Sequence, residues 1–172
     1  PVVLAGLMGS PPPELEGGGQ VKVNLMLRRL PRLRDDSVTA EQAFGGTFHI
    51  NETWSQLESA YASASSGSIP DPLPCEIYCH SLADPSILSP ALRESGAATL
   101  TVFGLHAPHE IQARDNDAMR IRLTDAVLAS LNSVLAEPIQ EVLMTDSSGR
   151  PCIETKTTVD LEHALNMTGG NI

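Results

Sequence analysis

The sequence is poor in aromatic residues, cysteine and basic side chains, and each shortage excludes a class of protein. Aromatic residues make up 3% of the 172 positions, so the core has to be built mainly from aliphatic side chains. The cysteines number 3, which is too few, and odd, for a disulfide framework. The chain has 11 lysines and arginines against 21 acidic residues, a net charge of -10. This balance disfavours binding to the phosphate backbone, so we expect no nucleic acid as a partner.

Long apolar runs are also lacking. No stretch approaches the ~18 consecutive apolar residues of a membrane-spanning helix, and the run at Val2–Met8 is short. The sequence does not start with the basic and then apolar segments of a secretory signal. We therefore expect a cytoplasmic protein and leave membrane association open. Pro1 stands where an intact chain would have Met, which predicts a fragment of a longer chain.

The length suits a single domain, 1–172, which can bury roughly two thirds of its unfolded surface. Residues 1–19, with their proline and glycine triplets, are expected to be an irregular lead-in. Strict alternation from Val21 to Arg28 predicts a strand with one buried face. Further strands are expected at 47–50, 76–80 and 98–104. Residues 139–144 and 152–158 are expected to form a hairpin around a turn at 146–149.

Helical patterns lie between these strands. Thr53 and Gln56 form a capping box for a helix that ends at Gly67 and would place Trp54 and Tyr61 on its apolar face. The longest helix is expected from about Asp117 to Ala136, and a short one follows Thr158. Strands are joined by short loops as often as through helices. The sequence therefore predicts an α+β fold, a mostly antiparallel or mixed sheet with helices packed on one face.

No self-contained catalytic motif is present, since G-x-S-x-G, the P-loop, H-E-x-x-H and G-x-G-x-x-G are all missing. Cys75, Cys79 and His80 form a possible metal half-site. On a strand, however, His80 would point away from the face that the two cysteines share. Structural cysteines are therefore favoured, and no metal site is predicted.

Several polar residues leave two interpretations open. His49, beside a glycine pair, could line a pocket or be a polar residue of an edge strand, and we take it as a candidate substrate-binding residue. The arginine run between Arg28 and Arg34 could be a basic patch, but a solvated strand end and turn is favoured. A loop set could hold a metal or simply be exposed, and exposure is favoured; its members are His106, His109, Asp115 and Asp117.

A series of segments occurs in a fixed order from about Gly19 to Ile172. They are Gln20-Val-Lys-Val-Asn-Leu-Met-Leu, Leu30-Pro31, Gly46-Thr-Phe-His-Ile50, Leu57-Glu-Ser-Ala-Tyr61, Gly67-Ser-Ile-Pro70, Ser81-Leu-Ala-Asp-Pro-Ser-Ile-Leu-Ser-Pro90, Val159-Asp-Leu-Glu162 and Gly169-Gly-Asn-Ile172. In their order and spacing they resemble the phytoene-desaturase-like FAD-dependent oxidoreductases. The subgroup to which the chain is most similar is the one named pyridine nucleotide-disulfide oxidoreductase domain-containing protein 2.

The resemblance implies that the chain is the substrate-binding domain of a longer flavoenzyme, inserted between flavin-binding parts that lie outside it. Residues 159–172 would return toward the flavin domain, with Gly169, Gly170 and Asn171 as cofactor-binding residues. The flavin would carry the hydride chemistry on an apolar small-molecule substrate, and the fragment alone would be inactive.

Two other functions are open. The domain could be a non-catalytic protein-interaction or assembly module, or, more weakly supported, a metal-binding domain that uses Cys75, Cys79 and His80.

Overall fold

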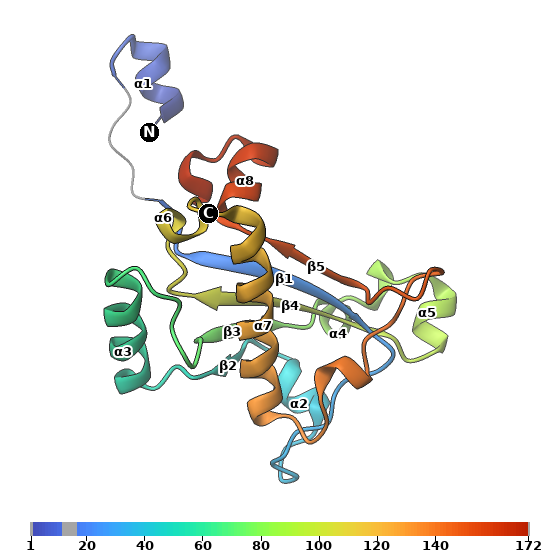
Figure 1. The fold of residues 1–172 in the computed structure, drawn as a ribbon. Coiled ribbons are helices and arrows are strands. Elements are labelled where there is room, and N and C mark those ends of the chain that lie inside the picture. Colours follow the sequence, from blue (N-terminus) through green and yellow to red (C-terminus); the bar gives the residue numbers. More distant parts are fainter. Residues whose placement is uncertain (1, 12–16, 172) are drawn as a thin grey trace.

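The computed structural model describes residues 2–11 and 17–171 and has an α+β fold built on a five-stranded sheet (Figure 1). The strand order is β2-β3-β4-β1-β5, and all neighbouring strands run antiparallel. The bounds are β1 Gln20–Leu27, β2 Phe48–Ile50, β3 Cys75–Tyr78, β4 Ala98–Leu105 and β5 Ile153–Lys156. The α+β class with an antiparallel sheet, predicted from the short connections, is confirmed.

Strand β1 shows the alternation that its sequence predicts. Its buried and half-buried residues alternate along the whole strand, and Val21, Val23, Leu25 and Leu27 are buried. It pairs with β4 from Gln20↔Leu105 to Leu27↔Ala98 and with β5 on its other edge. One face of these central strands is therefore aliphatic, and it forms the floor of the core.

Helix α7 (Asn116–Val134) covers that face. In Figure 1 it runs across the sheet. Apolar residues at helical spacing predict a stripe of Met119, Leu123, Val127, Leu131 and Val134 or Leu135; the first four are buried in α7, and Leu135 is buried directly after it. Gly104 on β4 allows the helix to pack closely, because a Cβ there would lie 3.2 Å from Val127 Cγ2 of α7 and only 2.7 Å from Leu73 Cδ2. The predicted bounds of this helix, 117–136, are within two residues of those observed.

The other helices are short. They are α1 Val2–Met8, α2 Ala40–Phe44, α3 Trp54–Ser65, α4 His80–Ala83, α5 Pro90–Glu94, α6 His109–Gln112 and α8 Thr158–Leu165, with 3₁₀ turns η1 Pro85–Ile87, η2 Ile139–Glu141 and η3 Thr168–Gly170. The predicted capping box of Thr53 and Gln56 is present, and that of α8 uses Thr157 and Asp160. Within the described residues, no helix is both long and apolar enough to cross a membrane.

Two elements differ from the sequence prediction. Residues 1–19 were expected to be irregular, but Val2–Met8 form α1, a run that lies before the proline triplet that starts at Pro11. The predicted strand at 139–144 is wrong: Ile139–Glu141 form η2, which buries Ile139 in the core. Met144 still receives a hydrogen bond from Cys152 N and donates one to Met26 O. Of the expected hairpin, only β5 forms a strand, and the segment before the turn forms isolated bridges at Leu143 and Thr145.

Two burial predictions also fail. Trp54 and Tyr61 do not form an apolar contact face of α3, because their exposed fractions are 84% and 66%. The small residues Ala60 and Ala64 are buried instead, so α3 contacts the rest of the domain through its alanines. The three prolines of the connection at 69–74 predict an extended, exposed segment, yet Leu73 is fully buried between β4 and α7.

Replacing Leu131 by alanine tests whether the α7 contact carries the fold. Leu131 is completely buried, so Leu131→Ala should lower the free energy of unfolding by about 3 kcal/mol. Ile121 lies on the same helix and is 65% exposed, so Ile121→Ala should cost less than about 0.5 kcal/mol. Urea denaturation of both variants measures the difference. Equal losses would contradict the packing described.

Candidate functional site

The sheet face opposite α7 is polar and only partly covered. A row of side chains crosses all strands on this open face in register: Lys156, Lys22, Phe103, Glu76 and His49. A second row consists of Glu154, Asn24, Thr101 and Tyr78. Most of these side chains are half-buried or exposed, whereas their neighbours along the central strands β1, β3 and β4 are buried in the core. We use the name "open face" for these two rows and for Met26, Thr99 and Cys152 beside them.

An apolar hollow of about 480 Å³ lies at one end of the open face. Met26, Thr99 and Cys152 contribute to it from the sheet and its margin, and His80 and Ile87 border it from α4 and η1. Its size lies within the range of small-molecule pockets, about 300–1,000 Å³. The sequence prediction missed this hollow because its walls come from segments more than 100 residues apart.

The polar groups around the hollow are mostly satisfied by one another. Asn24 Nδ2 donates to Glu154 Oε2 at 3.0 Å, and Thr101 Oγ1 donates to Asn24 Oδ1 at 3.0 Å. The hydroxyl of Thr99 is different, because its Oγ1 is buried and has no hydrogen-bond partner. The hollow therefore has mainly apolar walls, which suit an apolar ligand.

The candidate substrate-binding residue His49 lies on the edge strand β2, away from the residues that line the hollow. Its side chain is 50% exposed, and its Nδ1 lies 2.7 Å from Glu52 Oε2. Its cross-strand neighbour on the open face is Glu76. A role for His49 in substrate binding stays a prediction, and the structure places the residue in a cluster with two glutamates.

The candidate cofactor residues Gly169, Gly170 and Asn171 lie beside the segment that leads into β1. Gly18 N donates to Gly169 O at 2.8 Å, and Gln20 Nε2 donates to Gly170 O at 3.0 Å. Both glycines have φ near 61°, and a Cβ on Gly170 would lie 2.1 Å from Thr158 O. The incoming and outgoing segments of the domain therefore run side by side, and glycine is needed there by the fold itself.

These residues do not by themselves make a cradle for a flavin. The amide of Gly169 donates to Glu162 Oε1, and those of Gly170 and Asn171 donate to the carbonyls of Met167 and Thr168. An anion-binding loop needs free backbone N–H groups. Contact of these residues with FAD stays a prediction, and it would have to use atoms other than these amides.

Two of the three cysteines form part of the core. Cys75 and Cys79 are buried, and burial raises the pKa of the Cys75 thiol to about 12. A zinc ligand must be a thiolate, so this environment disfavours metal binding at Cys75. His80 begins α4 and stacks on Tyr78 with the ring centroids 6.2 Å apart. The structure therefore favours the structural interpretation of the cysteines.

The loop histidines and aspartates are not brought together. His109 Nδ1 lies 3.0 Å from Thr158 Oγ1, whereas the ring of His106 meets the edge of Tyr61. Asp115 caps α7 through Ala118 N, and Asp117 pairs with Arg120. Each side chain thus has a local structural partner.

The arginine run connects the segment that follows β1 to the C-terminal end of α7 and the residues after it. Arg29 and Arg32 both bind Glu137, whose side chain is 9% exposed. The hydrogen bond from Arg29 lowers the pKa of Glu137 to about 2. Arg34 donates to the carbonyls of Asn132 and Leu135 at the end of the helix. The favoured interpretation, a solvated turn, overlooked this tie because the partners lie about 100 residues away.

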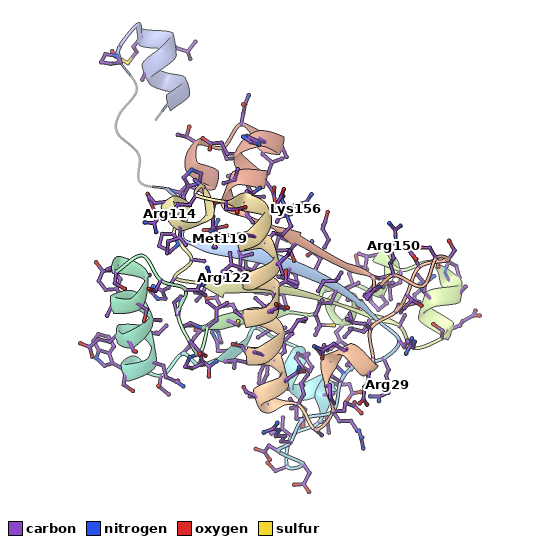
Figure 2. All side chains as sticks on the ribbon, in the orientation of Figure 1. Arg29, Arg114, Met119, Arg122, Arg150 and Lys156 are labelled. Atoms are coloured by element: carbon purple, nitrogen blue, oxygen red, sulfur yellow. The ribbon has the colours of Figure 1, made fainter. Side chains whose placement is uncertain are left out.

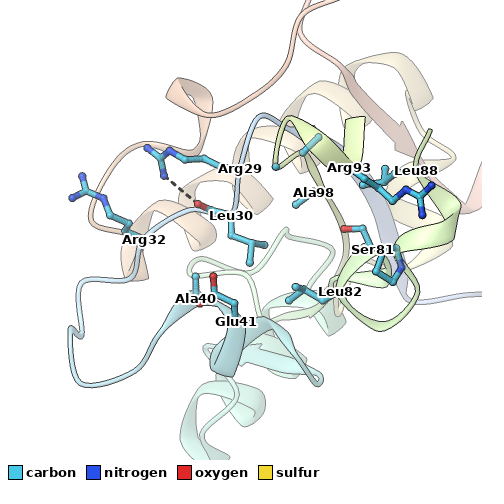
Figure 3. Close-up of a pocket in the computed structure, with 13 residues that line it drawn as sticks. Arg29, Leu30, Arg32, Ala40, Glu41, Ser81, Leu82, Leu88, Arg93 and Ala98 are labelled. Atoms are coloured by element: carbon cyan, nitrogen blue, oxygen red, sulfur yellow. Dashed lines mark hydrogen bonds between the residues drawn. The ribbon is translucent and has the colours of Figure 1, made fainter. Parts of the chain in front are cut away.

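Arg29 and Arg32 also border a pocket of about 840 Å³ (Figure 3). Figure 3 shows Arg29 and Arg32 on one side of it and Arg93 with Leu88 on the other, with Leu30 and Leu82 between them. Other labelled basic residues, such as Arg114 and Arg150, lie on different sides of the molecule (Figure 2). The basic side chains are therefore dispersed.

The comparisons with known proteins find sequence relatives but no described function. The chain is 67% identical over all 172 residues to proteins called uncharacterized in Mycobacterium tuberculosis (strain H37Rv) and in Mycobacterium bovis. It spans 32% of the length of these relatives. No family model matches the chain. No solved structure matches it either.

Substitution of Gly170 tests the close contact between the incoming and outgoing segments. Gly170→Ala should lower the free energy of unfolding by about 3 kcal/mol or more, because the new Cβ meets the backbone of Thr158. Gly149 also has a positive φ but faces open space, so Gly149→Ala should cost only about 1–2 kcal/mol. Urea denaturation compares the two variants. A Gly170 variant as stable as the Gly149 variant would refute the contact.

Proposed function

We propose that this chain is the substrate-binding domain of an FAD-dependent oxidoreductase, similar to phytoene dehydrogenases, that oxidises or desaturates an apolar substrate. The hydride chemistry would belong to the flavin, held by parts of the longer protein outside these residues. The chain's own task would be to bind the substrate, orient it and exclude water from it. The chain alone would have no turnover.

The apolar hollow on the open face is the observation that carries this proposal. In this two-layer domain α7 covers one face of the sheet, and the open face is available for contact with another domain. That open face has a hollow with apolar walls. Met26 and Ile87 line the hollow and can contact a hydrocarbon. Covering the open face by a flavin domain would close the hollow and remove water from it.

The adjacent chain ends of the domain also support the proposal. Because Gly18 and Gly169 are hydrogen-bonded, a host domain could continue from both segments at one place on its surface. An inserted substrate domain needs this arrangement. The longer mycobacterial relatives, of which the chain spans 32%, leave room for such a host.

A protein-interaction module is the second candidate. Trp54 and Tyr61 lie on α3 with 84% and 66% of their surface exposed, and aromatic residues are enriched in protein–protein interfaces. This module would need no flavin, so the two functions differ in a property that can be measured directly.

The absorbance spectrum of the longer relative from Mycobacterium tuberculosis tests the proposal. We expect the purified protein to be yellow, with an oxidised-flavin spectrum, and the 172-residue chain to show no FAD binding in a fluorescence titration. A variant of the longer protein in which a short Gly-Ser linker replaces the counterpart of residues 20–168 should remain yellow, because the adjacent segments Gly18 and Gly169 allow the excision.

Each arm has a contradicting result. A longer protein that stays colourless after incubation with FAD would favour the interaction module. Tight FAD binding by the 172 residues alone would overturn the division between substrate and flavin domains.

A further inference from the structure

The edge of the open face brings together a histidine and two glutamates. His49 on β2 lies opposite Glu76 on β3, and Glu52 follows β2 after a turn in which Asn51 has a φ of 60°. One donor atom from each of these residues lies within 4.8 Å of the other two. Imidazole and carboxylate are donors that zinc and related transition metals prefer.

The carboxylates of this cluster lack a cationic partner. Among residues 2–11 and 17–171, neither Glu52 nor Glu76 forms an ion pair with a lysine or arginine. Glu52 Oε2 binds His49 Nδ1 at 2.7 Å, but Glu52 Oε1 is buried and has no hydrogen-bond partner. A buried carboxylate oxygen without a partner is costly, and a cation bound to the other oxygen would lower that cost by neutralising the charge of the carboxylate.

Tyr78 provides a further feature of metal sites, a residue that orients a ligand. Its hydroxyl donates to Glu76 Oε2 at 2.9 Å. Partners of this kind hold ligating carboxylates in place in metal sites. The side chains are also reachable, since His49 is 50% and Glu52 15% exposed.

We propose that His49, Glu52 and Glu76 bind a divalent transition-metal ion of the zinc type. The nitrogen donor of His49 disfavours Mg²⁺ and Ca²⁺, which take oxygen ligands. Zinc ligands at ~2.0–2.2 Å lie roughly 3–3.5 Å apart, so small side-chain rotations would complete the site. The ion would replace the proton between His49 Nδ1 and Glu52 Oε2, and three protein ligands leave a coordination position for water or a ligand.

Zinc titration of the 172-residue chain, in competition with a chromophoric chelator, tests this site. We expect one zinc ion per chain and a rise of the unfolding temperature when zinc is added. His49→Gln, Glu52→Gln and Glu76→Gln should each weaken binding by roughly tenfold or more, and Tyr78→Phe should weaken it less. Mg²⁺ should neither compete nor stabilise.

Control variants show whether the loss is specific to this cluster. Glu154 lies on the same open face but binds Asn24 and Lys156, and His163 is an exposed histidine on α8. Glu154→Gln and His163→Gln should bind zinc as the unmodified chain does. Because His49 is half exposed, its substitution leaves the core intact, and circular dichroism verifies this for every variant.

The absence of stoichiometric zinc binding would overturn the proposal. Wild-type affinity in the His49→Gln and Glu76→Gln variants would also overturn it, as would equal losses in the two controls. The titration involves no flavin, so the site stands or falls independently of the proposed oxidoreductase function.

Discussion

The packing of α7 on one face of the sheet is the contact on which the rest of the structure depends. Leu123, Val127 and Leu131 fill the space over β1 and β4, and Gly104 lets the helix come close enough to do so. With so few aromatic residues, the core depends on this aliphatic interdigitation. A two-layer arrangement covers one face of the sheet and leaves the other partly exposed to solvent, as antiparallel sheets commonly do.

The other features of the molecule follow from that asymmetry. The open face holds the apolar hollow at one end and the His49–Glu52–Glu76 cluster at the edge strand β2. Both regions contain a buried polar atom without a partner, Thr99 Oγ1 in one and Glu52 Oε1 in the other. Unsatisfied buried polar groups are rare in folded proteins, so these two atoms mark positions where the described residues lack a polar partner.

Much of the fold could be predicted from the sequence, because local periodicity decides it. The alternation of β1 and the four-residue stripe of α7 need no partner to be recognised, and both are confirmed. The segment 139–144 failed because its pattern permits a strand, while Pro138 and the core pocket for Ile139 select a 3₁₀ turn. Trp54 and Tyr61 failed because spacing shows which residues share a face but not whether that face is covered.

The candidate site was less accessible to sequence reasoning. His49 was singled out, but its partners depend on the register of β2 and β3, which no local pattern reveals. The spacing of His49 and Glu52 was a usable signal, whereas Glu76 and the hollow emerge only when strands distant in sequence are aligned. Gly169 and Gly170 were expected to bind the cofactor, which stays a prediction. In the structure they closely approach the backbone of Gly17 and Thr158.

The reactivity of Cys152 tests most directly whether the open face is completed by the rest of a longer protein. Cys152 borders the hollow and is partly exposed, whereas Cys75 and Cys79 are buried and serve as internal controls. Alkylation should modify Cys152 in the 172-residue chain and should slow markedly at the equivalent position of the longer protein, where a cysteine can be introduced if needed. Equal rates in both proteins would contradict a covered open face.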